Sequence, residues 1–366
     1  TGYFLKYKKK FIFIFYIKMI IEYFNKPFLR WLKINFLSNK VIFFLYKKFI
    51  IDKYNSNDQL FNQLKKIKPD LIIYPSHCYE PETYKIVEMA EKINSKTLFL
   101  IDNWDNLSTK TVLFKKPNAI TVWGDQTKEH AMKIHEIPEK NIFKIGNPKF
   151  DSYFSLRKKK LESNFKFSYI LFLGVRVEYQ ELEALKILDN EISKNIYNNL
   201  KILYRPHPGN EFLIKKAKNF NFVNVIFDPN MKNFTETGDV SYLNNKDNYF
   251  EKLITNSLFL VGCLTTVTIE ALLFKKKQIY FSYPEKFNIA GPKQIAELIY
   301  FDNIGKISAL TECNQLNKLP LIFRKFYKNN ENKKINKNLD QEINYFYEIS
   351  KKTYSEKIFS IVKELI

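Results

Sequence analysis

From residue 70 onward, short apolar runs alternate with stretches of helical spacing, and this alternation restricts the fold more than any other feature. Strand, helix and strand at such intervals are typical of βαβ units around a parallel sheet. In the first half, strands are predicted at Asp70–Tyr74, Thr97–Ile101, Ala119–Trp123 and Asn141–Ile145, with helices at Glu82–Lys92 and Gln126–His135.

The same alternation restarts after the polar, charged segment Leu156–Lys166. Two successive runs of α/β units predict two doubly wound domains that face each other. The second run predicts strands at Tyr169–Leu173, Lys201–Tyr204, Phe222–Phe227, Leu258–Val261 and Gln278–Phe281, and helices at Tyr179–Leu188, Val267–Phe274 and Leu339–Ile366. The expected domains are a basic aromatic segment (1–60), an α/β domain (61–155), a linker (156–166), a second α/β domain (167–325) and a helical tail (326–366).

Composition excludes several classes of protein. With 366 residues, 45% of them apolar, the chain is long enough to bury a core without disulfides or metal. Its three widely spaced cysteines exclude a disulfide framework and favour a reducing, cytoplasmic compartment. The net charge of +21 would attract phosphates or anionic membranes, although an AT-rich genome also enriches lysine.

Residues 1–60 hold a large share of that charge. Twelve basic side chains stand against three acidic ones, interleaved with aromatic and aliphatic residues. The apolar runs Phe11–Ile17 and Val41–Tyr46 fall short of the ~20 residues that a membrane-spanning helix needs. This segment suits a helix on the inner face of the cytoplasmic membrane, or else a core helix.

Several cofactor signals are absent from the sequence. It contains no Asp-x-Asp, no GxGxxG and no GxxxxGK[ST], so a metal-bound nucleotide, a dinucleotide or a P-loop is not indicated. No histidine pairs with cysteines at zinc spacing. His130 and His135, on a charged helix, are expected to be solvated.

In open α/β sheets, ligands bind beyond the carboxyl ends of the strands. In the first half, one such position carries His77 and Glu80. Another carries Asp102, Trp104 and Asp105, which could supply a general base and an aromatic platform for a sugar. The alternative is an Asx-rich turn, in which Asp and Asn bond to their own backbone.

In the second half, Arg205 and His207 emerge at a predicted strand end, where Pro206 and Pro208 restrict the backbone. A guanidinium and an imidazole can both bind phosphate oxygens. Gly174 and Arg176, which follow the predicted strand Tyr169–Leu173, are a weaker candidate for the donor site.

A threonine-rich turn precedes the predicted helix Val267–Phe274. Hydroxyls and backbone N–H groups at a helix N-terminus can bind phosphate, and an acid in its first turn can cap the helix or bind a ribose. The alternative is an ordinary capping box. The residues concerned are Thr265, Thr266, Thr268 and Glu270.

With these motifs, residues 70–300 resemble bacterial GT-B glycosyltransferase-like proteins of surface-polysaccharide biosynthesis. That group includes CDP-glycerol glycerophosphotransferases, CMP-sugar transferases with an HP motif, and the related UDP-sugar 2-epimerase fold. The resemblance rests on Arg205-Pro206-His207-Pro208, Thr265–Ala271 and Asp102–Asn106.

The resemblance implies two Rossmann-like domains, with the donor bound by the C-terminal one and the acceptor by the N-terminal one. It also implies metal-independent transfer without a cofactor. Arg205 and His207 would contact donor phosphate, the three threonines would close around it, and Glu270 would face the ribose. Asp102 or Asp105 would deprotonate the acceptor, with His77 the rival base, and Trp104 and Glu80 would bind the acceptor. The Thr-Thr turn departs from the Ser-Ser or Gly-Ser of many relatives and leaves the donor class open.

The predicted function is therefore transfer of a sugar, or a polyol phosphate, from a nucleotide-activated donor to an oligosaccharide or lipid-linked acceptor. Contact with an anionic membrane fits this function, and nucleic acid is not an expected partner. The alternatives are a nucleotide-sugar epimerase on the same fold and a non-enzymatic basic protein that binds membrane or nucleic acid.

Overall fold

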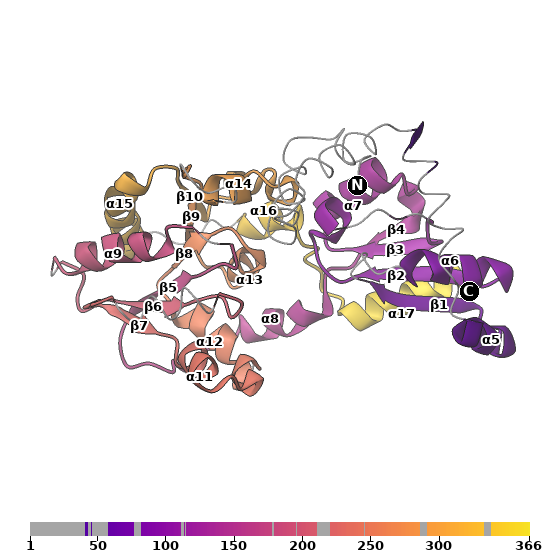
Figure 1. Ribbon diagram of the computed structural model, residues 1–366, viewed down its shortest axis with the longest axis horizontal. Helices are drawn as coiled ribbons and strands as arrows, with labels where there is room; N and C mark the ends of the chain where they lie inside the picture. The colour runs from indigo at the N-terminus through magenta and orange to yellow at the C-terminus, as the bar shows by residue number, and fades with distance from the viewer. Residues whose placement is uncertain are drawn as a thin grey trace, which may run out of the picture. The chain divides into compact units, whose positions relative to one another are not determined.

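The computed structural model describes residues 41, 42, 45, 58–76, 82–110, 113, 115–177, 179–194, 196–210, 220–244, 246–285, 291–332 and 338–366 (Figure 1). The chain divides into two units, each with its own parallel sheet. The first unit comprises the residues up to Asp151 together with Ile343–Ile366, and the second comprises Ser152–Glu342.

The first unit is built on four parallel strands in the order β1-β2-β3-β4. Its core gathers apolar side chains from β2, β3 and the helices that connect the strands. The elements are α5 (Asp58–Ile67), β1 (Leu71–Ser76), α6 (Glu82–Lys92), β2 (Lys96–Ile101), β3 (Ala119–Val122), α7 (Asp125–His135), β4 (Ile142–Lys144) and α17 (Tyr354–Leu365).

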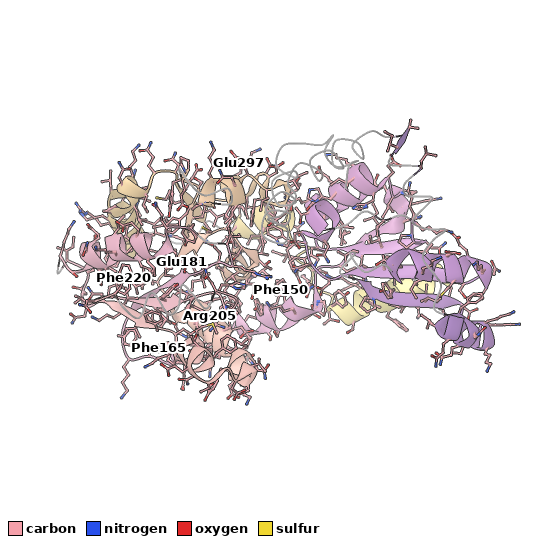
Figure 2. All side chains as sticks on the ribbon, in the orientation of Figure 1. Phe150, Phe165, Glu181, Arg205, Phe220 and Glu297 are labelled. Carbon is pink, nitrogen blue, oxygen red and sulfur yellow. The ribbon has the colours of Figure 1, made fainter. Side chains whose placement is uncertain are left out.

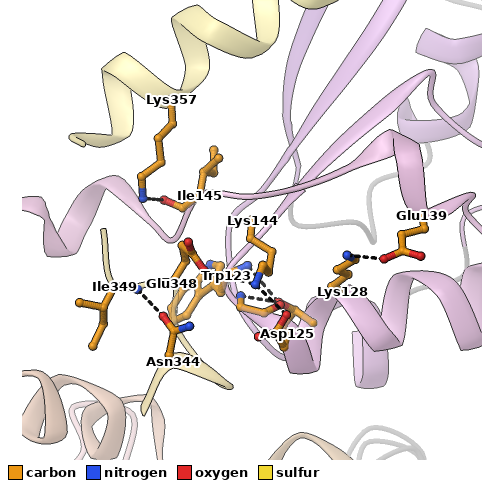
Figure 3. A network of polar contacts seen from close by, with 12 residues as sticks. Trp123, Asp125, Lys128, Glu139, Lys144, Ile145, Asn344, Glu348, Ile349 and Lys357 are labelled. Atoms are coloured by element: carbon orange, nitrogen blue, oxygen red, sulfur yellow. Dashed lines mark hydrogen bonds and ion pairs between the residues drawn. The ribbon is translucent and has the colours of Figure 1, made fainter. Parts of the chain in front are cut away.

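The C-terminal segment returns to this first unit after the chain has completed the second (Figure 3). The backbone N–H of Glu348 donates to the carbonyl of Trp123 at 2.6 Å, and Lys357 donates to the carbonyl of Ile145 at 3.0 Å. The carboxylate of Glu348 also lies 3.5 Å from Lys144. These contacts attach the segment to the ends of β3 and β4.

Close backbone packing also holds this segment. A β-carbon on Gly124 would lie 2.6 Å from the backbone carbon of Phe346, so only glycine allows this approach. Helix α17 begins at a capping box, in which Thr353 accepts from the N–H of Glu356 and the Glu356 carboxylate accepts from the N–H of Thr353.

The second unit is built on six parallel strands in the order β10-β9-β8-β5-β6-β7. The strands are β5 (Tyr169–Leu173), β6 (Lys201–Arg205), β7 (Val225–Phe227), β8 (Leu260–Cys263), β9 (Gln278–Phe281) and β10 (Leu310–Cys313). The helices are α8 (Asp151–Leu156), which begins at the border between the units, α9 (Glu181–Ile192), α11 (Pro229–Thr237), α12 (Tyr249–Asn256), α13 (Thr266–Leu273), α14 (Pro292–Ala296), α15 (Leu319–Asn332) and α16 (Leu339–Asn344), which crosses back into the first unit at Ile343.

The strand order of the second sheet reverses between β5 and β8. The chain adds β6 and β7 on one side of β5, then crosses back to add β8, β9 and β10 on the other. All five residues of β5 are buried, as expected for a parallel strand covered on both faces. The reversal creates a topological switch point at the carboxyl ends of β5 and β8.

The predicted fold class is confirmed: both units are α/β with parallel sheets. Tyr169–Leu173 and Gln278–Phe281 are strands over the predicted residues. Several details differ. Strand β10 was not predicted, β7 is shorter than the predicted strand Phe222–Phe227, and Leu339–Ile366 forms two helices, α16 and α17, instead of one. The described helices that were not predicted are α5, α8, α11, α12, α14 and α15. Within the part of the chain that the structure describes, no helix combines the length and the apolar character that crossing a membrane requires.

Candidate functional site

Three loops leave the carboxyl edge of the second sheet next to its switch point. Leu173 at the end of β5 lies opposite Arg205 on β6 and opposite Gly262 on β8, so these neighbouring strands end together. Ligands bind at such an edge in open α/β sheets. The residues predicted from the sequence on these loops are Gly174 and Arg176 after β5, His207 after β6, and Thr265, Thr266 and Thr268 after β8.

Gly174 allows the first two loops to approach each other. Its N–H donates to the carbonyl of Arg205 at 2.9 Å. A β-carbon at this position would lie 2.9 Å from Cα of Pro206 and 2.5 Å from Oε1 of Glu181. Any other residue would push the loops apart, so glycine is required by close approach.

His207 is held in one orientation between its two flanking prolines. The N–H of Gly209 donates to Nδ1 of the ring at 3.0 Å, so the neutral ring carries its proton on Nε2. Burial lowers the pKa of His207, and the positive charge of Arg176 lowers it further. At neutral pH the ring is therefore uncharged, and Nε2–H is available to donate to a ligand oxygen.

Arg205 and Arg176 differ in their surroundings. The guanidinium of Arg205 pairs with the fully buried carboxylate of Asp228 and lies over the Phe250 ring, 5.0 Å from its centroid. Tyr249 donates to the same carboxylate at 2.7 Å. Arg176 is exposed, whereas the side chain of Arg205 is 18% exposed, so Arg176 is the more accessible of the two guanidinium groups. The predicted contact of Arg205 with donor phosphate stays a prediction.

The threonine turn begins helix α13 with a capping box, as the alternative interpretation of this motif proposed. The hydroxyl of Thr265 accepts from the N–H of Val267 at 3.1 Å, and the hydroxyl of Thr268 accepts from the N–H of Thr265 at 3.2 Å. Thr268 is fully buried, whereas Thr265 and Thr266 are partly exposed. A ligand can therefore reach the first two threonines, and the role of Thr268 is to shape the turn.

Glu270 is buried within the second unit. Its side chain is 2% exposed, and Tyr153 of α8 donates to its Oε2 at 2.5 Å. Burial raises the pKa of Tyr153, and the charge of Glu270 raises it further, so the tyrosine remains a donor. The predicted contact with a ribose stays a prediction, because the carboxylate already has a partner inside the protein.

Glu181 is a further residue of this edge that sequence reasoning missed (Figure 2). Its carboxylate, 1% exposed, accepts from the hydroxyl of Tyr204 and, at 3.3 Å, from the N–H of Val175. Burial raises the pKa of Glu181 to about 7, and these hydrogen bonds oppose the rise. It fixes the loop that carries Gly174. No sequence signal distinguished it, because an acid in the first turn of a helix usually compensates the helix dipole at the surface.

In the first unit, the segment after β2 places its aromatic and acidic residues in different surroundings. Trp104 is 1% exposed, stacks on Trp123 with 6.5 Å between ring centroids, and contacts Phe346 edge-on. The indole predicted to stack on a sugar thus has a core position. Asp102 is exposed and Asp105 partly exposed, so both stay candidates for the acceptor base. His77 and Glu80 lie outside the described residues.

The expectation that His130 and His135 are solvated is wrong. Both are buried, because one face of α7 packs against the core. Nε2 of His135 lies 2.7 Å from the carbonyl of Leu107, and Nδ1 accepts from the N–H of Leu113 at 3.3 Å. Burial lowers the pKa of His135 to about 4, so it is a neutral structural residue.

The structure thus brings Gly174, Arg176, His207 and the threonine turn to one sheet edge, whereas the predicted acceptor residues belong to the other unit. Among the described residues, no group of three or more His, Cys, Asp or Glu side chains could hold a metal ion. The predictions of metal independence and of no cofactor stay predictions.

Comparison with known proteins identifies the fold. No protein-family model matches the chain, and no curated protein matches it in sequence. The solved UDP-GlcNAc 2-epimerase of Methanocaldococcus jannaschii is similar to it with a TM-score of 0.52 and 16% identity, over 85% of this chain and 84% of that one. The complex of a Methanocaldococcus jannaschii UDP-GlcNAc 2-epimerase with UDP-GlcNAc and UDP gives a TM-score of 0.48 and 18% identity, over 84% and 79% of the two chains. A variant of the wall teichoic acid polymerase TagF gives 0.43 and 13%, over 88% and 98%.

The first of these likenesses carries the structural conclusion, and it concerns the fold alone. The chain has the GT-B fold, with two α/β units built on parallel sheets.

Proposed function

We propose that this chain is a glycosyltransferase that moves a sugar, or a polyol phosphate, from a nucleotide-activated donor to a surface-polysaccharide acceptor. The observation that carries the proposal is the group of loops at the switch point of the second sheet. They present the Nε2–H of His207, the guanidinium of Arg176 and the N-terminal turn of α13 at one edge. Each of these groups favours a phosphate oxygen.

The donor would bind at this edge through its phosphates. As the bond to the leaving nucleotide breaks, negative charge grows on the phosphate oxygen, and a guanidinium, an N–H donor and a helix N-terminus can stabilise it without a cation. Metal independence is therefore part of the proposal.

The acceptor would bind to the first unit, where Asp105 or Asp102 takes the proton of the attacking hydroxyl. The hydroxyl oxygen forms a bond to the transferred group, the bond between that group and the donor phosphate breaks, and the nucleotide departs with the electron pair. His77 is the rival base. An oligosaccharide and a lipid-linked glycan are the expected acceptors.

A thermal-shift measurement with CMP, CDP, UDP and GDP tests the donor site first. A nucleotide that binds the folded protein raises its apparent melting temperature. A panel of nucleotide sugars carrying the base that binds then tests the activity. Release of nucleotide that depends on an acceptor supports transfer. Binding of none of the four nucleotides would contradict the proposal.

An epimerase on the same fold is the second candidate, and the fold likeness to a UDP-GlcNAc 2-epimerase favours it over other activities. The two candidates differ in one observable. An epimerase interconverts its nucleotide sugar without acceptor and leaves the nucleotide attached, which product analysis distinguishes from transfer.

We also propose that residues 1–60, with their surplus of basic side chains, bring the enzyme to the inner face of the cytoplasmic membrane. The full chain should then float with anionic vesicles and be released as salt increases. Equal flotation with neutral vesicles would contradict this role.

A further inference from the structure

A cavity of about 550 Å³ opens at the amino edge of the second sheet. It lies where helices α8, α12 and α13 end and where the chain enters β8 and β9. Between Leu258, in its wall, and Cys263, at the other end of β8, the extended chain covers roughly 16 Å. The cavity is therefore separate from the donor edge.

The lining of this cavity is strongly cationic. None of the described residues that line it is acidic. The basic lining residues are Arg157, Lys159, Lys160, Lys275, Lys276 and Lys277.

Four of these cations have partners within the protein: Arg157, Lys275, Lys276 and Lys277. Arg157 forms two bonds to Asp340, at 3.2 and 3.3 Å, and one to the carbonyl of Leu273 at 3.1 Å. Lys275 pairs with the same carboxylate. Lys276 donates to the carbonyl of Ser257 at 2.6 Å, and burial lowers its pKa to about 8.

Lys159 and Lys160 are different. Both side chains are exposed at the mouth of the cavity, and neither has a side-chain hydrogen bond or ion pair to another described residue. Their charges are therefore available to a ligand.

The simplest structural explanation of these lysines is that their positive charges compensate the partial negative charges of helix C-termini. This explanation accounts for only part of the positive charge. Each of the three helix ends contributes at most about half a negative charge, or roughly one and a half in total. Asp340 contributes one more. Lys277 has a partner of its own and is left out of this balance. The other five cations exceed these negative charges by more than two, so the cavity favours a multiply charged anion.

We propose that this cavity binds a phosphate-bearing ligand at a site separate from the donor site. Arg157, Lys275 and Lys276 are already held in place by their partners and form the inner wall, and Lys159 and Lys160 close on the ligand from the mouth. Ammonium groups bind phosphate as point charges and need no fixed orientation, which suits two exposed lysines. The phosphate can belong to a soluble molecule or to a lipid headgroup.

The test compares two double variants of the full chain. Lys159→Gln/Lys160→Gln removes the two free charges of the cavity. Lys186→Gln/Lys232→Gln removes two exposed lysines from α9 and α11 of the same unit, outside the cavity. All four side chains are exposed, so both variants should fold as the wild type does. One arm titrates inorganic pyrophosphate calorimetrically, and the other sediments phosphatidylcholine vesicles with and without phosphatidylglycerol.

We expect the cavity variant to bind roughly tenfold more weakly than the wild type in one arm, while the control variant is unchanged. The effect in the pyrophosphate arm identifies a soluble phosphate ligand, and the effect in the vesicle arm identifies a lipid headgroup. His207→Ala should retain this pyrophosphate binding, because the donor edge lies at the other end of the strands. Equal affinity of the two double variants in both arms, or no binding in either arm, would overturn the proposal.

Discussion

The imidazole of His207 offers the most informative single perturbation of the donor site. The two ring nitrogens have different hydrogen-bonding roles. Nδ1 accepts from the N–H of Gly209 within the loop, and Nε2–H is left for a ligand. A substitution can therefore remove one function and keep the other.

His207→Ala should weaken nucleotide binding by roughly ten- to a hundred-fold. A hydrogen bond to a charged phosphate contributes about 1.5–3 kcal/mol, and each 1.4 kcal/mol is about a tenfold change in affinity. The bond from Gly209 lies at the surface, so its loss should cost less than about 1 kcal/mol of folding free energy. Pro206 and Pro208 restrict the loop in both proteins.

Two further variants separate the roles of the nitrogens. In His207→Gln, the side-chain amide reaches about as far as Nε2 and can donate to phosphate. In His207→Asn, the amide oxygen stands near the position of Nδ1 and can accept from Gly209, but nothing reaches the ligand. Isothermal titration of all three variants with the nucleotide that the wild type binds, alongside urea unfolding, gives both readouts.

The expected order of nucleotide affinity is wild type, then Gln, then Asn and Ala together. Wild-type affinity in His207→Ala would refute the placement of the donor site. Recovery in Asn but not in Gln would show that the ring only maintains the loop.

Three other outcomes follow from the same account. Asp105→Asn should retain nucleotide affinity while turnover falls by about a hundredfold or more, as expected for an acceptor-side base, and steady-state kinetics with calorimetry test the contrast. Burial raises the pKa of Glu181 from 4.5 to about 7. Between these two pH values, the carboxyl group keeps its proton in the folded chain and loses it in the unfolded chain. Stability should therefore fall as pH rises from about 4.5 to 7, by roughly 3 kcal/mol from this group. Urea unfolding of Glu181→Gln should lack that part of the slope, and an unchanged slope would contradict the assignment. Activity, once a donor is found, should survive EDTA, and loss restored by Mg²⁺ or Mn²⁺ would refute metal independence.

Much of the fold could be predicted from the sequence because parallel strands are buried on both faces and appear as continuous apolar runs. Tyr169–Leu173 is such a run, and all of its residues are buried. Strand β10 was missed because it lies at the sheet edge and places Thr311 and Glu312, which are not buried, in its centre. The return of the C-terminal segment has no local signature, since the Tyr347 hydroxyl bonds to Asn147 across 200 residues of sequence.

The positions of the candidate site residues at strand ends could be predicted from the sequence, but their burial could not. The rule that ligands bind beyond strand ends led to His207 and the threonine turn, which lie at the carboxyl edge as expected. The sequence does not reveal which side chains there point inward. Trp104 is of a residue type that often stacks on sugars, but here it is a core residue. Glu181 stands where a surface acid is expected, but it is buried. Both depend on tertiary packing, to which a residue's neighbours in sequence give no guide.

The most direct test of the account is hydrogen–deuterium exchange of the full chain with and without the nucleotide that it binds. The account predicts slower exchange in three segments of the second unit: the loop of Gly174 and Arg176, the loop from Arg205 to Gly209, and the turn from Thr265 to Thr268. Slower exchange confined to other segments, with these three unchanged, would contradict the donor site proposed for this fold.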